Sequence, residues 1–405
     1  MTNNALAREA GDVQALLAHL GPEPGNWVPA HEGVRHDVVI VGAGQSGIAA
    51  AFALRRQGLT AFVIDAAKDG EEGVWRERAR MATLRTPKRR PGPELGIPEL
   101  SFKAWYAAHH GADAYDKLGR VPRLTWADYL QWFRKVLDLK VQFRTRLVSV
   151  AGAGRDLDLT LEQNGQQHTV RTRKLVLATG LAAGGGRNIP SVISDNLPQS
   201  LFSHTDELLD YSVFKGRNIG ILGASASGFD AAAEALEAGA ATVHVFCRAK
   251  ALAHGARYRA ADFPGADYFH LLDDCERWRV ARLYLMRGNH PPPSALDRVR
   301  GYENFYLHLD APWRGARTIG AAAEITTRDQ TFAFDYVIAA TGFHHNPDLA
   351  PELAALADKI ARWEDRYTPP PGEEDRVVAR IPYLGPAFQF QEIVEGAAPY
   401  LTNIH

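Results

Sequence analysis

Two stretches of the chain share one order of hydrophobic and polar positions: a short β-branched run, a glycine-containing turn, and then small and apolar residues at helical spacing. The first occupies residues 36–57 and is followed by an apolar run at 60–64; the second occupies 218–237 and is followed by 242–246. Apolar runs of about four to eight residues predict buried strands, and apolar positions about three or four apart predict helices. Each stretch therefore predicts a strand, a turn, a helix and a second strand.

Residues 145–180 show a different pattern, in which leucines alternate with polar residues. This alternation predicts strands, and Asn164-Gly165 is a strong signal for a hairpin turn. The last strand of this meander closes on Ala178-Thr179-Gly180, and a similar buried run closes on Ala340-Thr341-Gly342. We therefore expect a second unit to be inserted into the first, which resumes near residue 335.

The N-terminal residues predict one helix with a single apolar stripe. Apolar positions in residues 6–20 alternate between four and three apart, and Gly21-Pro22 follows them. This spacing is typical of a helix with one buried face, and Gly-Pro ends a helix. We expect the helix to pack on the body of the protein rather than to bind a partner.

The first glycine turn has the spacing of a dinucleotide-binding loop. Gly42 permits the tight turn, Gly44 lets the backbone approach a pyrophosphate, and Gly47 lets the helix lie close to the strand. The phosphates would rest on the helix N-terminus beside Gln45 and Ser46, because free N–H groups and the helix dipole favour anions there.

The strand after this turn ends at Asp65, 23 residues after Gly42. A carboxylate at this position accepts hydrogen bonds from a ribose hydroxyl and repels a 2′-phosphate. The first site is therefore predicted to bind FAD or NAD rather than NADP.

The second glycine turn repeats the pattern with serine in the middle position. Its residues are Gly223, Ser225, Ala226, Ser227 and Gly228. Serine is small enough for close approach of a phosphate, although it is less permissive than glycine. The strand that follows ends in Arg248 and Lys250 instead of an acid. Arg248 can pair with a 2′-phosphate and Lys250 adds charge, although a solvated strand end is the alternative. FAD and NADPH are the pair of dinucleotides that fits the two sites.

Composition excludes several other classes of protein. Lys and Arg number 46 and Asp and Glu 47, so no global positive charge exists to attract nucleic acid or anionic lipid. The longest apolar run, 38–54, is shorter than the roughly 20 residues that a membrane span needs. Two cysteines, Cys247 and Cys275, form no disulfide framework. With no secretory signal apparent, we expect a cytoplasmic protein that binds neither nucleic acid nor membrane.

The ordered motifs resemble the class B flavoprotein monooxygenases, which include flavin-containing, N-hydroxylating and Baeyer–Villiger monooxygenases. The likeness rests on the two glycine turns with their acid and arginine, on Gly73-Val74-Trp75, on the two Ala-Thr-Gly closures and on the helix-like stretch Trp126–Phe133. It covers roughly residues 35–345. It implies an α/β fold with two Rossmann-like dinucleotide-binding domains, the NADPH domain being inserted into the FAD domain.

The expected domains follow from this resemblance. They are an N-terminal helical arm at 1–34, the first part of an FAD-binding domain at 35–205, an NADPH-binding domain at 206–334 with an aromatic-rich insertion at 251–316, and a return segment of the FAD domain at 335–405. FAD would bind through Gly42, Gly44, Gly47 and Asp65, and NADPH through Gly223, Ser225, Gly228 and Arg248. To these sites we add Trp75, Thr179, Gly180, Thr341 and Gly342; Trp75 shapes the flavin pocket or is a core tryptophan.

Family chemistry implies that NADPH passes hydride to FAD and that the reduced flavin captures dioxygen as a C4a-hydroperoxide, which oxygenates a small-molecule nucleophile. Because the cofactor carries the difficult chemistry, no catalytic residue is assigned. We expect N- or S-oxygenation rather than ketone insertion, because only His204 of the Baeyer–Villiger fingerprint is present over 198–208. Adjacent histidines at 109–110 and 344–345 lack metal-ligand spacing, so no metal is expected.

Other readings stay open. The chain could be a Baeyer–Villiger enzyme, an NADPH-dependent flavin reductase or oxidase without oxygen transfer, or a non-catalytic nucleotide-binding protein. Relatives continue past the segment that resembles residues 400–404, whereas this sequence ends at His405. Either the chain is trimmed or the flavin is held less completely than in the family. A homodimer is also left open.

Overall fold

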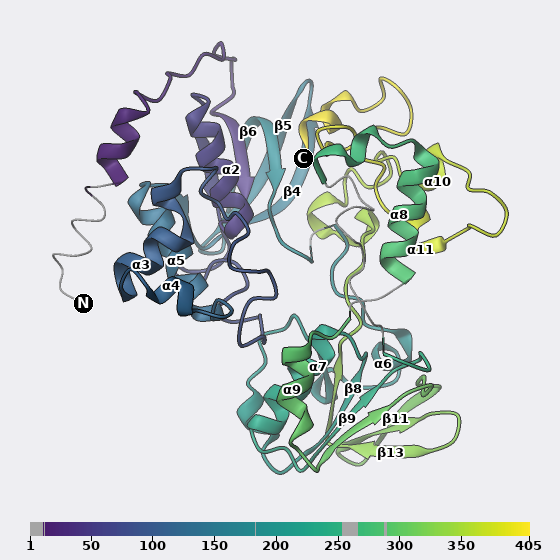
Figure 1. The fold of residues 1–405 in the computed structure, drawn as a ribbon. Helices are drawn as coiled ribbons and strands as arrows, with labels where there is room; N and C mark the ends of the chain where they lie inside the picture. Colours follow the sequence, from purple (N-terminus) through teal and green to yellow (C-terminus); the bar gives the residue numbers. More distant parts are fainter. Residues whose placement is uncertain (1–10, 12, 183, 253–265, 287–289) are drawn as a thin grey trace.

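The computed structural model describes residues 11, 13–182, 184–252, 266–286 and 290–405. Two sheet-containing units lie one above the other in Figure 1, and the C-terminal segment returns to the upper one. We call the upper unit, whose sheet spans residues 36–177, the first unit. The second unit has its main sheet within residues 202–339.

A six-stranded sheet in the order β3-β2-β1-β6-β5-β4 forms the centre of the first unit. The strands are β1 (His36–Val41), β2 (Ala61–Ile64), β3 (Val141–Gln142), β4 (Thr145–Ala153), β5 (Asp156–Gln163) and β6 (Gln166–Leu177). β1 runs parallel to both neighbours, β2 and β6, while β4, β5 and β6 form the predicted antiparallel meander. Asn164 and Gly165 have φ of 51° and 77°, as a tight hairpin turn requires. The predicted strands and hairpin are confirmed.

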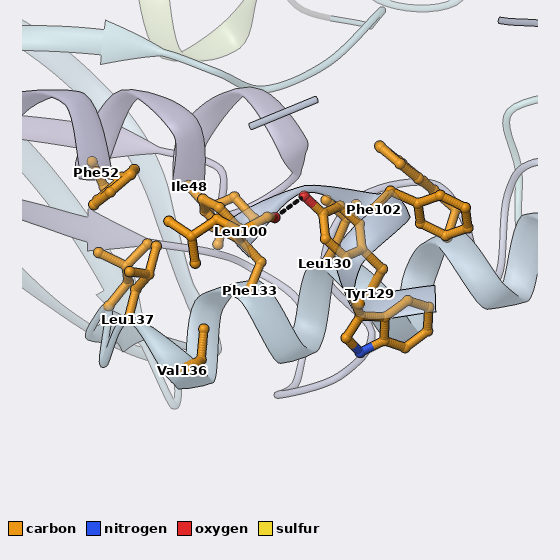
Figure 2. Packing of buried hydrophobic residues seen from close by; sticks show 14 of the residues in the cluster. Ile48, Phe52, Leu100, Phe102, Tyr129, Leu130, Phe133, Val136 and Leu137 are labelled. Atoms are coloured by element: carbon orange, nitrogen blue, oxygen red, sulfur yellow. Dashed lines mark hydrogen bonds between the residues drawn. The ribbon is translucent and has the colours of Figure 1, made fainter. Parts of the chain in front are cut away.

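Helices cover one face of this sheet. They are α2 (Gln45–Arg56), α3 (Phe102–His110), α4 (Ala114–Lys117) and α5 (Arg123–Val136). Figure 2 shows α5 against α2, where the rings of Phe52 and Phe133 meet edge to face with centroids 5.8 Å apart. The Tyr129 hydroxyl, buried in the same cluster, donates to the Leu100 carbonyl at 2.7 Å. The predicted helix over 126–133 is thus part of the main core.

The described part of the N-terminal segment is helical over residues 13–19. Val13 is buried in the same core, and the Gln14 side chain donates to the Val136 carbonyl at 2.9 Å. This part of the predicted helix therefore packs on the body of the protein, while residues 1–10 and 12 lie outside the described residues.

The second unit contains a parallel five-stranded sheet in the order β10-β9-β8-β14-β7. Its strands are β7 (Phe202–His204), β8 (Asn218–Leu222), β9 (Thr242–Phe246), β10 (Phe305–His308) and β14 (Tyr336–Ala339). Two helices, α7 (Ala226–Glu237) and α9 (Pro293–Arg300), pack in one core with this sheet. The antiparallel strands β11 (Gly315–Ile319), β12 (Ala322–Thr326) and β13 (Thr331–Phe334) form a separate sheet that shares the other core.

The expected boundaries at 205 and 335 need correction. β7 and β14 both belong to the second sheet, because β14 pairs with β8 on one side and β7 on the other. The two Ala-Thr-Gly closures look alike because each follows the strand that lies beside the glycine-turn strand of its own unit: β6 beside β1, and β14 beside β8. The closure at 340–342 therefore ends the second sheet and does not resume the first.

The chain returns to the first unit only after β14. The far C-terminal residues run beside β6, where His405 N–H donates to the Leu175 carbonyl and Leu177 N–H donates to the His405 carbonyl, both at 2.8 Å. Apolar side chains of this segment share a core with the first sheet; they are Ala350, Leu353, Leu356, Ile360, Phe390, Ala398, Leu401 and Ile404. The short helices of the segment are α10 (Trp363–Arg366) and α11 (Arg376–Ala379).

The aromatic-rich stretch 251–316 does not form a single insertion. Its α9 and β10 are integral to the second unit, whereas α8 (Asp274–Met286) lies beside α10 and α11 in Figure 1. Trp278 of α8 is buried against Trp363 and Val378. Tyr258 and Phe263, two aromatic residues of this stretch, lie outside the described residues. The short helix α6 (Ser191–Ser194) precedes β7.

Candidate functional site

At two positions of the first glycine turn, no residue other than glycine fits. Gly42 has φ of 104° and donates its N–H to the Ile64 carbonyl at 2.8 Å. A Cβ on Gly42 would lie 2.4 Å from the Ala178 carbonyl oxygen, and a Cβ on Gly47 would lie 1.8 Å from the Gly42 carbonyl oxygen. These contacts place the N-terminus of α2 directly beyond the ends of β1 and β6.

The N-terminus of α2 is chemically open to an anion. Gly44 is its N-cap, no side chain caps the helix, and no acidic residue lies in its first turn. The first N–H groups of a helix have no intrahelical acceptor, so they attract a phosphate. Ser46 is exposed in this turn, while the Gln45 side-chain oxygen accepts a hydrogen bond from the Trp126 indole at 3.1 Å. Gln45 therefore fixes the turn to α5.

Asp65 lies at the end of β2 with both carboxylate oxygens bound to the backbone. One oxygen accepts from the Ala43 N–H at 2.7 Å and the other from the Ala67 N–H at 2.8 Å. A carboxylate offers about four acceptor positions, so this fixed group retains the capacity to accept ribose hydroxyls. The geometry suits the predicted role of Asp65 in FAD binding.

A small hollow opens beside this turn. Its lining comes from the glycine turn, from the loop before α3 and from α5: Ala43, Gly44, Ile48, Gly70, Glu72, Trp75, Arg76, Ala127, Leu130 and Gln131. Trp75 borders the hollow and also contacts the surrounding hydrophobic core, so its role in a flavin pocket stays a prediction.

A buried ion pair and a half-buried arginine hold the Trp75 loop. Glu72 accepts the Gly70 N–H at 2.6 Å and lies 3.3 Å from the Arg134 guanidinium of α5. Arg123 donates to the Trp75 carbonyl at 2.5 Å. These residues were not predicted. The acidic run before Gly73 and the arginines of the helical stretch were visible in the sequence, but their pairing was not.

The second glycine turn repeats the first almost atom for atom. Gly223 has φ of 117° and donates to the Phe246 carbonyl at 2.9 Å. A Cβ on Gly223 would lie 2.4 Å from the Ala340 oxygen, and one on Gly228 would lie 1.9 Å from the Gly223 oxygen. Ser225 is the N-cap of α7, and its side chain makes no capping bond. Ala226 is buried in the helix packing and Ser227 is exposed.

Cys247 follows β9 at the place where Asp65 follows β2. Its sulfur accepts the Ala249 N–H at 3.4 Å, as Asp65 accepts that of Ala67. The replacement of a carboxylate by a thiol removes the negative charge that would repel a 2′-phosphate. Arg248 and Lys250 are exposed, and neither makes an ion pair or hydrogen bond to another described residue. Both side chains therefore lie at the exposed end of β9, beside the second glycine turn.

The two Ala-Thr-Gly closures differ in their surroundings. Gly180 and Gly342 have φ of 83° and 79°, and Thr179 is exposed. Thr341 exchanges hydrogen bonds with Asn188: its hydroxyl donates to the Asn188 carbonyl, and the Asn188 amide donates back at 3.2 Å. The second closure is thereby tied to the segment that links the units.

His204 is fully buried at the end of β7, with its ring 5.3 Å from that of Phe343. Burial lowers its pKa below the ordinary value for histidine.

Within the described residues no group of three or more His, Cys, Asp or Glu side chains could hold a metal ion. No helix of the described chain is both long and apolar enough to cross a bilayer.

Comparison with known proteins identifies the family. The FAD-NAD(P)-binding family model matches residues 39–182, and the L-lysine 6-monooxygenase/L-ornithine 5-monooxygenase model matches residues 114–262. The chain is 41% identical over 389 residues to the FAD-dependent urate hydroxylase of Xanthomonas campestris pv. campestris, covering 93% of this chain and 80% of the relative. The chain belongs to the class B flavoprotein monooxygenases. It is a flavin-dependent oxidoreductase that uses FAD and NAD(P)H.

Solved structures share the fold of this class B flavoprotein monooxygenase. The reduced form of ornithine hydroxylase from Pseudomonas aeruginosa superposes with a TM-score of 0.67 at 18% identity, covering 89% of each chain. L-lysine 6-monooxygenase from Pseudomonas syringae gives a TM-score of 0.62 at 18% identity, covering 88% of this chain and 89% of that one. At 18% identity this likeness shows the α/β fold with parallel sheets, and it does not identify the substrate.

Proposed function

We propose that this monooxygenase hydroxylates urate, or a purine of the same charge and degree of oxidation, with FAD at the first glycine turn and NADPH at the second. The observation that carries the substrate proposal is the 41% identity to a urate hydroxylase over 93% of the chain. Urate is a planar, electron-rich anion in neutral water. It is therefore a suitable acceptor for an electrophilic oxygen atom.

Each part of the proposed cofactor arrangement has a residue-level basis. When bound, FAD takes a hydride from NADPH and, once reduced, activates dioxygen. The α2 N-terminus would bind the FAD pyrophosphate, Asp65 would accept hydrogen bonds from its ribose hydroxyls, and Trp75 would border the flavin. Arg248 and Lys250 would bind the 2′-phosphate of NADPH beside Cys247. We further propose that the second unit is an NADPH domain inserted into an FAD domain formed by the first unit and the C-terminal segment.

N-oxygenation of a primary amine is the second candidate. The match of residues 114–262 to the lysine and ornithine monooxygenase model favours it. S-oxygenation, ketone insertion and uncoupled oxidation of NADPH have no comparable support. The two candidates differ in charge, because an amine substrate is a cation until it loses a proton, whereas urate is an anion.

NADPH consumption by the FAD-loaded enzyme in air tests the proposal. Urate, xanthine, ornithine, lysine, a sulfide and a ketone are compared, and hydrogen peroxide is measured alongside. We expect urate to stimulate NADPH oxidation with little peroxide. Stimulation by ornithine or lysine alone would transfer the assignment to N-oxygenation. NADPH oxidation that no substrate changes, with matching peroxide, would identify an oxidase and refute both candidates.

A further inference from the structure

A buried carboxylate joins the two units close to the second glycine turn. Asp230 lies in α7 two residues after Gly228 and is only 5% exposed. Its Oδ2 pairs with the Arg85 guanidinium of the first unit, and its Oδ1 lies 3.9 Å from Arg298 of α9. Burial raises the pKa of Asp230, while both guanidiniums act to lower it. A carboxylate so buried is costly unless it is paired, so the Arg85 contact is a strong constraint on α7.

Arg85 belongs to the loop that begins at Trp75, the residue bordering the hollow. Arg123 of α5 binds this loop along its length, donating to the Trp75 carbonyl at 2.5 Å and to the Met81 carbonyl at 3.1 Å. Leu84 N–H donates to the Val121 carbonyl at 2.8 Å. The loop from Trp75 to Arg85 is thus fixed to the first unit at several points before it reaches α7.

Arg298 crosses the same border in the opposite direction. It donates to the Arg80 carbonyl at 2.9 Å, and on its own unit it pairs with Glu234 at 3.0 Å and Glu237 at 2.7 Å. The Arg80 guanidinium in turn lies over the buried ring of Tyr211, 5.2 Å from its centroid. Two arginines of the first unit therefore meet an acid, an arginine and an aromatic ring of the second.

We propose that Asp230, through Arg85, is a positioning residue that sets the first turn of α7 against the Trp75 loop. In this way the NADPH-binding turn is placed relative to the flavin pocket. The inference rests on the proposed binding of NADPH at the second turn, and it does not depend on the identity of the substrate. Hydride transfer moves a hydrogen with both its electrons from dihydronicotinamide to oxidised flavin, leaving NADP⁺ and reduced flavin. A misplacement of about 1 Å can slow such a step by roughly a hundredfold.

The test uses the FAD-loaded protein with four changes: Arg85→Gln, Arg85→Lys, Asp230→Asn, and Arg85→Gln combined with Asp230→Asn. The control is Arg317→Gln, which removes the ion pair between the exposed Arg317 of β11 and Glu324 of β12. Three quantities are measured without substrate: the Kd of NADP⁺ by calorimetry, hydrogen–deuterium exchange of residues 76–85 and 226–230, and the anaerobic rate of flavin reduction by NADPH.

For Arg85→Gln we expect FAD content and the NADP⁺ Kd to stay within threefold of wild type. Reduction should slow at least tenfold, and exchange should rise in both segments together. Arg85→Lys, which keeps the charge, should recover part of the rate, and the double variant should be no worse than the poorer single variant. The control should match wild type in all three measurements.

Unchanged reduction and unchanged exchange in Arg85→Gln would overturn the positioning role. So would a slower rate explained wholly by weaker NADP⁺ binding or lost FAD, or NADP⁺ that fails to protect residues 226–230 in the wild type. If NADPH reduces the flavin of the wild type but urate is not oxygenated, only the substrate proposal is refuted and the positioning role of Asp230 is unaffected.

Discussion

Gly44 and Gly73 lie backbone to backbone, so close that a Cβ on either would sit 3.4 Å from the Cα of the other. Gly44 begins α2, and Gly73, with φ of 77°, stands two residues before Trp75. The contact joins the glycine turn to the loop that forms the opposite wall of the hollow. Two motifs that are 29 residues apart in the sequence therefore lie side by side in the structure.

The repeated glycine geometry allows the two dinucleotide sites to be disabled separately. In Gly47→Ala the new Cβ would lie 1.8 Å from the Gly42 oxygen, and in Gly228→Ala 1.9 Å from the Gly223 oxygen. We expect Gly47→Ala to lose most of its bound FAD, and Gly228→Ala to keep FAD but raise the KM for NADPH at least tenfold. Visible flavin absorbance per protein and steady-state kinetics measure the two effects.

Gly315→Ala is the matched control, because a Cβ there meets nothing within 4 Å. It should retain both cofactors. Loss of FAD from Gly228→Ala with normal NADPH binding would mean that the two sites had been assigned in reverse.

The nucleotide preference should depend on Arg248. Loss of a charge-assisted contact costs about 1.5–3 kcal/mol, or roughly tenfold to a hundredfold in affinity. We expect Arg248→Ala to raise the KM for NADPH by that factor and to leave the KM for NADH within about twofold, because NADH has no 2′-phosphate. Arg328→Ala, at another exposed arginine of the second unit, is the control. Equal effects of Arg248→Ala on both nucleotides would remove this residue from the 2′-phosphate site.

Much of this arrangement follows from local sequence, and some of it cannot. The glycine turns were predictable because steric demands at Gly42 and Gly223 act within a few residues of the chain. β14 was assigned to the wrong sheet because a buried apolar run reveals that a strand forms but not which strand it pairs with. The pair Arg85–Asp230 joins residues 145 apart, and no local pattern marks it.

The docking of α8 was beyond prediction for the same reason. Trp278 looked like any aromatic residue of an insertion, yet it is buried against Trp363, 85 positions further along the chain.

Cys247 was interpreted from the sequence only as a cysteine without a disulfide partner. Its correspondence to Asp65 emerged once both were seen to accept the N–H two residues ahead.

Trp278 should account for much of the stability of α8 on the C-terminal segment. It is 1% exposed, its indole donates to the Glu373 carbonyl at 2.8 Å, and replacing a buried tryptophan by alanine costs about 3–5 kcal/mol. We expect Trp278→Ala to lower the urea midpoint and to increase deuterium uptake in residues 274–286. Trp27→Ala, at a 69% exposed tryptophan, should change neither by a comparable amount. Equal effects of the two changes would show that the α8 contact adds little stability.

The histidine pair of β9 and β10 should make the second unit sensitive to acid. The Nδ1 of His244 and the Nε2 of His308 lie 2.9 Å apart, and burial lowers both pKa values, that of His244 to about 4. The unfolded chain takes up protons near the ordinary pKa of about 6.5, which the folded pair resists. Stability is therefore full above about pH 6.5 and declines as the pH falls toward 4.

Thermal unfolding from pH 7 to pH 4 tests this dependence. His244→Phe, which keeps a ring among the neighbouring aromatics, should flatten the decline, whereas His168→Phe at an exposed position should not. An unaltered pH profile in His244→Phe would show that this pair does not contribute to it.

The most direct test of urate hydroxylation is the fate of dioxygen labelled with a heavy oxygen isotope, followed by mass spectrometry while the FAD-loaded enzyme consumes NADPH in the presence of urate. We predict one labelled oxygen atom in each molecule of oxidised urate and one NADPH consumed for each such molecule. Unchanged urate, with all of the label recovered as hydrogen peroxide, would contradict the proposed function.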